Sequence, residues 1–555
     1  MFSARRLLGL LAVLVGMAAA QPVVDGGGVV NAASYALTGL PNSSIAQGSI
    51  FSVFGRAMGP AALQQAGFPL PTQLAGTSVK VTVGGQTVDA LMLYTSATQL
   101  ACVLPSRTPV GTGTLQVTYN QQTSNPAPIT VVKASFGILA LNMAGSGPGV
   151  FTDANQVPNT LAWSAQPNEV WVLWGTGLGG VSFDESRGAP KEDLKDSDAE
   201  VYVGFKKAEI LFRGRGPGWS GLDQVNFRVP PGAEGCYVPV VVKAGGVVSN
   251  FVTFSIAAGK RTCADPFGLS DAEIDQAKTR NAFSMGTISL MKTSLSLPLI
   301  PGFGDPSMRL ETGAADFVRY DFNRLIRSRG ASGYAPFGQC VVYTFKGQDY
   351  SFDDPIQGTG LDAGNVSVAG PKGTRQFRLD SRGHYSADLG GSGIPGIPGG
   401  QDEYLVKGSY TVTASGGADV RAFTATLNFP DPLTWANRES VNVIPRSQDL
   451  RVTWTGGGPA QEYVSIVGVS MRTAPEVGAA FLCTERAGTG SFTVPSIVLA
   501  ALPASQLGGG PTGVPSGILM LGSEPLREPN KFRATGLDAG CFSYTVLSGK
   551  SVTYQ

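Results

Sequence analysis

The sequence predicts a mainly β protein: tandem β-sandwiches, a short helical linker region and a β-rich C-terminal half. One basis is composition, because 74 glycines and 37 prolines make up a fifth of the 555 residues and separate short runs rich in Val, Thr, Tyr and Phe. Such a composition favours short strands joined by tight turns. The other basis is internal repetition. A chain of this length also exceeds what one core accommodates, so we expect several domains.

The first 20 residues have the pattern of a secretory signal. Arg5 and Arg6 form the charged start, residues 7–15 an apolar run, and residues 18–20 a small-residue cleavage site. The apolar run is too short to span a membrane, and no later segment has about eighteen uninterrupted apolar residues. We therefore expect export, no transmembrane segment after signal removal, and a secreted, extracellular or cell-surface location.

An apolar strand running into a glycine turn occurs twice, at residues 49–59 and 169–179. Phe54 corresponds to Trp174 at a spacing of 120 residues, and the glycines that follow them match at the same spacing. A second strand and turn, residues 79–84, recurs 120 residues later. Repetition in constant register predicts duplicated domains.

Further along, the spacing between the copies becomes 125 residues: Gln99 matches Gln224 and Pro105 matches Pro230. The second copy therefore carries about five extra residues within 213–221, and an insertion between two strands belongs in a loop. The predicted repeats, 28–134 and 135–258, have the size of β-sandwiches of about 100 residues.

Several motifs carry a family resemblance, at residues 31–35, 45–55, 217–226 and 245–250. They resemble a family of secreted acidobacterial proteins of unknown function, whose repeated domain was named from Solibacter. The resemblance covers residues 28–258 and implies tandem immunoglobulin-like sandwiches of the IPT/TIG type outside the cytoplasm. It implies no catalytic residues. The first copy departs from the family pattern because it lacks the Pro-Gly-Trp loop.

The remainder of the chain divides into three predicted regions. Residues 259–337 are expected to form a linker or a small α+β region, with a capping box at 269–274 that starts a short helix and an amphipathic helix at 314–327. Strand patterns then predict a β-rich domain at 338–439 and a C-terminal β-sandwich at 440–555.

Six cysteines in an exported chain make disulfides plausible. By proximity in sequence, we pair Cys236 with Cys263 and Cys483 with Cys541. Cys102 lies in an apolar run and is interpreted as a buried thiol. The absence of any CxxC pair argues against a zinc site.

Two patterns that can indicate catalysis favour structural interpretations. The G-x-G-x-x-G sequence at residues 175–180 is followed by residues 181–190, which have no helical period, whereas a dinucleotide site needs a helix there. We interpret it as a turn. His384 is the only histidine, which excludes multi-histidine metal sites, and we expect it on a surface hairpin.

Two candidate binding sites remain. Asp193, Asp196 and Asp198 offer closely spaced oxygen ligands for calcium, but without EF-hand spacing a solvated loop is the favoured interpretation. Trp219, with Arg213 and Arg215 nearby, is a candidate for stacking on a sugar or contacting a protein. Because the motif recurs in the resembled family, we favour a structural Trp219 packed under its loop.

The charge balance, 41 Lys and Arg against 40 Asp and Glu, gives no field that attracts nucleic acid. Without a catalytic constellation or a cofactor motif, the sequence favours a non-catalytic binding or structural module whose partner is an extracellular protein or a polysaccharide. The alternative is a carbohydrate-binding or polysaccharide-processing protein with its active part in the C-terminal half. A third is a spacer that presents another protein.

Overall fold

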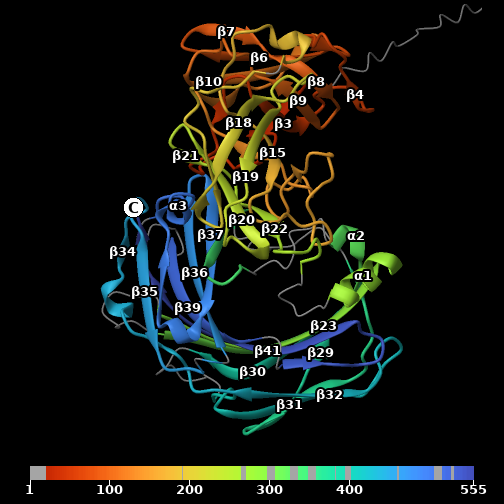
Figure 1. Ribbon diagram of the computed structural model, residues 1–555, viewed down its shortest axis with the longest axis vertical. Helices are drawn as coiled ribbons and strands as arrows, with labels where there is room; N and C mark the ends of the chain where they lie inside the picture. The colour runs from red at the N-terminus through yellow and green to blue at the C-terminus, as the bar shows by residue number, and fades with distance from the viewer. Residues whose placement is uncertain are drawn as a thin grey trace, which may run out of the picture.

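A computed structural model describes residues 21–190, 192–263, 271–296, 307–325, 335–347, 358–381, 383–393, 402–458, 460, 462–505, 516–526 and 530–555. The predicted signal, residues 1–20, lies outside this set. The chain is arranged as three bodies along the long axis of Figure 1: the first repeat, the second repeat, and a larger C-terminal module. Among the described residues, no helix has the length and apolarity needed to cross a membrane.

The first repeat is a sandwich of two sheets, ordered β1-β3-β9-β8-β4 and β2-β12-β10-β6-β5, with β7 and β11 added to the second. Its inward-facing residues form one core that includes Phe51, Val81, Leu100 and Leu115. The strands are β1 (Val23–Asn31), β2 (Ile45–Ala46), β3 (Ile50–Arg56), β4 (Gln64–Gln65), β5 (Gln73–Leu74), β6 (Thr77–Val83), β7 (Gln86–Asp89), β8 (Leu91–Thr95), β9 (Gln99–Val103), β10 (Gly111–Tyr119), β11 (Gln122–Thr123) and β12 (Ala127–Val132).

The second repeat is again two sheets, β13-β15-β19-β18 with β14, and β17-β16-β20-β21 with β22. Trp171, Phe227 and Phe254 are prominent in its separate core. Its elements are β13 (Gly137–Ile138), β14 (Phe151–Thr152), β15 (Val170–Thr176), the 3-10 helix η1 (Glu185–Arg187), β16 (Glu200–Val203), β17 (Lys206–Lys207), β18 (Glu209–Arg215), β19 (Asp223–Arg228), β20 (Gly235–Ala244), β21 (Val247–Val248) and β22 (Val252–Ile256).

Corresponding strands of the two repeats are separated in the sequence by the predicted spacings. Strands β3 and β15 are offset by 120 residues, and the larger offset applies from β9 and β19 onward. A Cβ on Gly55 would collide with the carbonyl of Val23, and one on Gly175 with the carbonyl of Gly137. Both glycines therefore allow the preceding strand to approach closely. The inserted residues lie between β18 and β19, in a loop as predicted.

A Ser-Asn pair makes corresponding hydrogen bonds in each repeat. The Ser124 hydroxyl accepts from Val117 N and the Ser249 hydroxyl from Val242 N. The following asparagine then bonds to both backbone groups of one early residue: Asn125 to Val24, and Asn250 to Ile138. This repeated bonding pins the first strand of each sandwich to its later strands.

The C-terminal module is organised around an 11-stranded sheet with the order β25-β37-β36-β39-β41-β23-β24-β30-β29, to which β26 and β40 are added. The elements of this sheet, with the two helices beside it, are α1 (Asp271–Arg280), β23 (Ala282–Ser296), β24 (Ser307–Asp321), α2 (Phe322–Leu325), β25 (Gln339–Lys346), β26 (Thr359–Gly360), β29 (Arg378–Leu379), β30 (His384–Gly393), β36 (Glu462–Thr473), β37 (Glu476–Arg486), β39 (Gly517–Pro525), β40 (Lys531–Phe532) and β41 (Ala539–Ser551).

Two smaller sheets cover one face of this large sheet. One has the order β28-β27-β31-β32 and the other β33-β35-β38, with the pair β34-β42 beside the latter. Their elements, with the short helices between them, are β27 (Val366–Gly370), β28 (Gly373–Gln376), β31 (Gly408–Ala414), β32 (Phe423–Phe429), β33 (Thr434–Trp435), η2 (Arg438–Ser440), β34 (Val443–Ile444), β35 (Leu450–Thr455), η3 (Ala487–Thr489), β38 (Ser491–Val494), α3 (Ser496–Leu499) and β42 (Thr553–Tyr554).

The predicted division of residues 259–555 is corrected by this sheet. Strands from all three predicted regions pair in it, so the boundaries at 337/338 and 439/440 fall within one sheet. Strand β23, from the expected linker, pairs in parallel with β41, about 250 residues later. A partner so distant in the chain leaves no local signal in the sequence.

The amphipathic helix predicted at 314–327 is wrong, whereas the short helix predicted after the capping box is present as α1. Residues 307–321 form β24, and only the four residues of α2 are helical. Phe317 and Ala315 lie on the buried face of a strand that pairs with β23 along its whole length. Pairing and burial along fifteen residues of a strand stabilise it more than the weak helical preference of these residues stabilises a helix.

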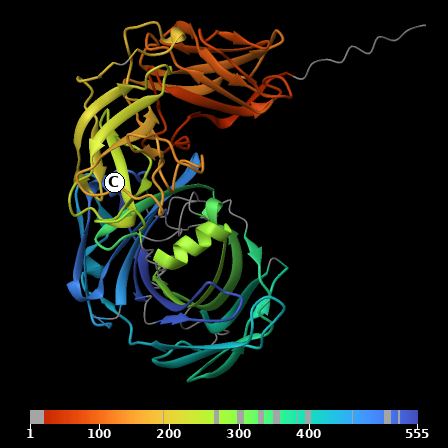
Figure 2. The same cartoon turned by 45° about the vertical axis from the view of Figure 1, so that its right-hand side comes forward.

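The large sheet has different neighbours on its two faces. Ile288 and Leu290 of β23 pack in a core with β31 and β32, whereas Phe283, at an odd-numbered position, packs against Ile274 of α1. Because side chains alternate along a strand, α1 and the small sheet β28-β27-β31-β32 lie on opposite faces of the large sheet. Figure 2 shows the sheet curving around α1.

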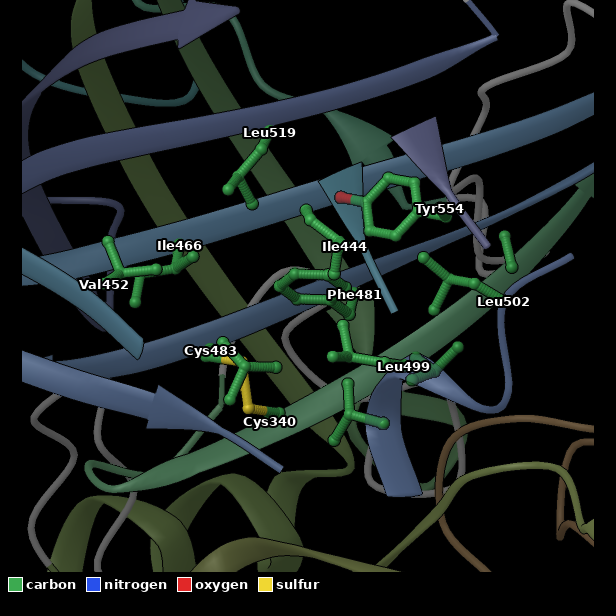
Figure 3. Close-up of a cluster of buried hydrophobic side chains, with 14 of the residues drawn as sticks. Cys340, Ile444, Val452, Ile466, Phe481, Cys483, Leu499, Leu502, Leu519 and Tyr554 are labelled. Carbon is green, nitrogen blue, oxygen red and sulfur yellow. A yellow bond between two sulfur atoms is a disulfide. The ribbon is translucent and has the colours of Figure 1, made fainter. Parts of the chain in front are cut away.

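One hydrophobic core joins the C-terminal module to the repeats. It contains Phe481 and Leu519 of the large sheet, Val452 of the covering sheet, and Phe251 and Leu40 from the two repeats. Figure 3 shows the part of this core around Phe481 and Tyr554. Arg472 also donates to the Gly39 carbonyl of the first repeat at 3.3 Å. The module and both repeats therefore share packed surface.

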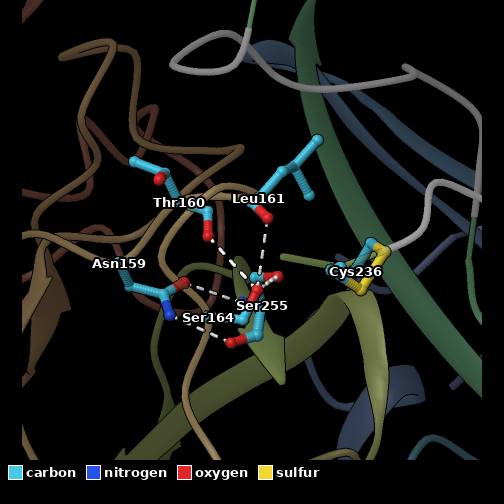
Figure 4. The surroundings of a disulfide bond; sticks show 7 residues. Asn159, Thr160, Leu161, Ser164, Cys236 and Ser255 are labelled. Atoms are coloured by element: carbon cyan, nitrogen blue, oxygen red, sulfur yellow. Dashed lines mark hydrogen bonds between the residues drawn. A yellow bond between two sulfur atoms is a disulfide. The ribbon is translucent and has the colours of Figure 1, made fainter. Parts of the chain in front are cut away.

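Two disulfides are present. Cys236 pairs with Cys263 as predicted, beside a polar cluster in which Asn159 bonds twice to Ser255 (Figure 4). The predicted bond between Cys483 and Cys541 is wrong, because Cys483 is bonded to Cys340. The two lie opposite each other on the paired strands β25 and β37, 143 residues apart in sequence, so pairing by sequence distance misleads. Cys102 is a buried thiol, as expected.

Replacing Cys340 by Ala should lower the free energy of unfolding by about 2–5 kcal/mol, because it releases a long closed loop. Urea-induced unfolding measures the loss. Cys541→Ala is the matched control and should leave the urea midpoint nearly unchanged. Peptide mapping without reduction should join the Cys340 and Cys483 peptides; a Cys483–Cys541 peptide would contradict the assignment.

Candidate functional site

The glycine turn after β15 is closed by a carboxylate of the chain itself. Gly177 N and Leu178 N donate to the Asp223 side chain at 2.7 and 2.8 Å. In a nucleotide site such N–H groups would face a phosphate. Here they face Asp223, at the start of β19, and the next helical element is the three-residue 3-10 helix η1. The turn therefore serves to anchor β19.

Asp223 forms an ion pair with Arg215, and both side chains are fully buried. Arg215 also donates to the Gly179 carbonyl at 2.6 Å and, in the first repeat, to the Gly48 carbonyl at 3.0 Å. Burial raises the pKa of the Asp223 carboxyl, while the Arg215 guanidinium and the turn N–H groups oppose that shift. The carboxylate therefore depends on Arg215 for compensation of its charge.

Further hydrogen bonds hold the two repeats together around this ion pair. The Glu185 carboxylate accepts from both the backbone N–H and the hydroxyl of Ser106, each at 2.8 Å. The Thr176 hydroxyl accepts from Ile50 N and donates to the Gly221 carbonyl. Asn31 donates across the boundary to the Thr176 carbonyl. The repeats are thus joined by buried polar contacts as well as by a short connection.

The loop between β18 and β19, residues 216–222, is here named the Trp219 loop. Its tryptophan is 58% exposed and contacts Phe68 of the first repeat, itself 43% exposed, with ring centroids 6.4 Å apart. The interpretation of Trp219 as packed under its loop is therefore wrong. Gly218 and Gly221 have φ of 82° and 72°, and the buried residue between them is Ser220, which donates to the Glu185 carbonyl. The indole is left facing outward.

The two candidate arginines do not extend this aromatic surface. Arg215 is buried in the ion pair. Arg213 donates to the carbonyls of Leu194, Lys195 and Ala199, so its guanidinium holds the neighbouring acidic loop. Both arginines stabilise the structure around the Trp219 loop rather than presenting free cations.

The predicted calcium ligands are not brought together. Asp193 accepts from Arg213 N, Asp198 accepts from Gly245 N, and Asp196 is exposed. Within the part of the chain that the structure describes, no three acidic, His or Cys side chains are grouped to hold a metal ion. His384 lies on the surface at the start of β30, 53% exposed, with Nδ1 2.5 Å from Asp316.

Three residues important for this site escaped sequence analysis. Asp223 was visible inside a motif, but nothing in the sequence indicated that it closes the glycine turn. Glu185 lies in a polar segment that resembles a solvated loop. Phe68 comes from the other repeat, about 150 residues before Trp219, and only the folded junction makes them neighbours.

Comparison with known proteins gives one domain match. A family model described as IPT/TIG domain matches residues 40–131, within the first repeat. This agrees with the two-sheet architecture of both repeats. No curated protein matches the chain.

The chain is also similar to several solved structures, at low identity. Domains 5–6 of the S-layer protein SbsC are 14% identical, with 43% of this chain and 100% of that chain covered and a TM-score of 0.15. Sidekick-1 immunoglobulin domains 1–4 are 9% identical, with 89% of this chain and 94% of that chain covered and a TM-score of 0.12. The ectodomain of mouse nectin-like molecule 4 is 10% identical, with 69% of this chain and 95% of that chain covered and a TM-score of 0.13.

Replacing Asp223 by Asn should destabilise the junction by about 3–5 kcal/mol, because Arg215 then keeps a buried charge without its counter-ion. The matched control is Glu209→Gln, which removes the exposed pair with Arg228 on the same two strands. That change should cost less than about 1 kcal/mol. Urea unfolding, followed by tryptophan fluorescence, measures the free energy of unfolding of both variants. Equal decreases for Asp223→Asn and Glu209→Gln would show that burial of the Arg215–Asp223 pair is unimportant.

Proposed function

We propose that this is an exported, non-catalytic multidomain protein that acts as a binding and structural module outside the cell or at its surface. The observation that carries the proposal is the exposed pair Trp219 and Phe68 on a rigid junction. Tryptophan is enriched among the residues that dominate binding energy, and its large rigid surface loses little entropy on binding.

Two features support the proposal. Residues from both repeats form the aromatic pair, and polar contacts such as the buried Arg215–Gly48 bond and the partly buried Glu185–Ser106 bond fix the repeats to each other, so the surface is preorganised. Preorganisation reduces the entropy lost on binding. The two disulfides are consistent with an oxidising compartment. The partner is an extracellular protein or a polysaccharide that presents an apolar face to the two rings.

Replacing Trp219 by Ala should weaken partner binding by about 2 kcal/mol, or roughly 30-fold, and Phe68→Ala by less. The measurement is binding of the purified protein to arrays of polysaccharides and of secreted proteins, with released sugar assayed in the same wells. Met143→Ala is the control, because Met143 is 74% exposed and lies elsewhere in the second repeat. Release of sugar would contradict the non-catalytic assignment, and equal binding by Trp219→Ala would contradict the aromatic surface.

A further inference from the structure

A separate cleft lies in the C-terminal module, on the face of the large sheet that carries the two covering sheets. Its floor is formed by β24, β23, β41 and β39, and one wall by Pro432 and Leu433, where the chain passes from β32 to β33. Its volume is about 350 Å³, within the range of about 300–1,000 Å³ typical of small-molecule sites. The cleft marks the place where the two covering sheets separate.

Charges in the cleft are matched. Lys292 forms an ion pair with Glu403, lies 3.7 Å from Glu311 and donates to the Leu405 carbonyl at 2.8 Å. Glu311 is only 2% exposed and also accepts from the backbone N–H groups of Tyr404 and Leu405. With Arg309, the described lining holds two cations and two carboxylates. Its formal charge is therefore zero.

One buried hydroxyl in the lining has no partner. Ser523, on β39, is 1% exposed, and among the described residues its Oγ has no hydrogen-bond partner. A buried polar group left unsatisfied is destabilising and uncommon in folded proteins. A ligand with a polar atom in the cleft would satisfy it. Ser294 and Ser548 add two further hydroxyls to the same lining.

The chemistry of the lining selects among ligand classes. An anion would need excess positive charge, and here the cations are matched by carboxylates. A peptide strand would need a free sheet edge, whereas each of the four floor strands is paired on both sides. A lipid tail would exclude water from the charged groups and hydroxyls of the lining without offering them hydrogen bonds. A neutral polyol fits, because its hydroxyls both donate to carboxylates and accept from Lys and Ser.

We propose that this cleft binds a short segment of a neutral polysaccharide. The hydroxyls of a sugar unit bond to Glu403, Lys292 and Ser523, and its C–H face packs on Leu433 and Val546. The site is separate from the Trp219 loop, which belongs to the repeats, so the protein has two independent binding surfaces.

The test uses the purified full-length protein and affinity gel electrophoresis in mixed-linkage β-glucan, xylan, galactomannan or dextran, with polygalacturonate and heparin as charged comparisons. At least one neutral polysaccharide should retard the protein. Calorimetry with an oligosaccharide from that polymer then gives the affinity. Ser523→Ala should weaken binding about 3- to 10-fold, because it removes one hydrogen bond. Ser548→Phe, which fills the cleft, should abolish retardation.

The matched control is Ser551→Ala. Ser551 also has a buried hydroxyl without a partner among the described residues, but it does not line the cleft. Its removal should leave binding unchanged. Retardation by charged polymers alone, by none, or equally for Ser523→Ala and Ser551→Ala overturns the inference. Loss of binding in Trp219→Ala with no change in Ser523→Ala also overturns it, while leaving the proposed function intact.

Discussion

The buried ion pair between Arg215 and Asp223 is the interaction on which the arrangement of the two repeats depends. Removing two charges from water is costly, and the cost is offset only when each charge is fully hydrogen-bonded. Asp223 meets this condition through the glycine turn and Arg215. The two terminal nitrogens of Arg215 bond to Asp223 and to the Gly179 and Gly48 carbonyls, whereas its Nε has no hydrogen-bond partner among the described residues. One pair therefore holds the turn, the base of the Trp219 loop and the first repeat in a single unit.

The first repeat shows what this position looks like without the ion pair. The residue that corresponds to Arg215 is Thr95, which is buried and donates to the Thr77 hydroxyl at 3.1 Å. Thr77 in turn donates to the Met58 carbonyl. The first copy thus has a short network of neutral hydroxyls where the second copy has a buried ion pair. At this position the second copy therefore differs from the first by a buried ion pair in place of hydroxyls and by the additional residues of the Trp219 loop.

The two candidate binding surfaces have a common physical origin. Each lies where two packed units meet: Trp219 and Phe68 at the boundary between the repeats, and the cleft where the covering sheets separate on the large sheet. Trp219 and Phe68 lie on loops at their boundary, whereas the floor of the cleft is formed by strands, and neither place is covered by a core. Side chains held in place before a partner arrives lose little entropy on binding, which is why both surfaces are proposed as binding sites.

The sequence by itself determined the mainly β class, the two repeats with their strand offsets and the loop insertion, because these depend on local patterns and on repetition. Distance in sequence predicted the Cys236–Cys263 bond but also the wrong Cys483–Cys541 bond, so it did not determine the disulfides. Tertiary structure decided the rest. The pairing of β23 with β41, the Cys340–Cys483 bond and the contact between Phe68 and Trp219 join segments more than 140 residues apart. No periodicity encodes such contacts, since each follows from the packing of whole sheets, and the exposure of Trp219 followed only from the folded loop.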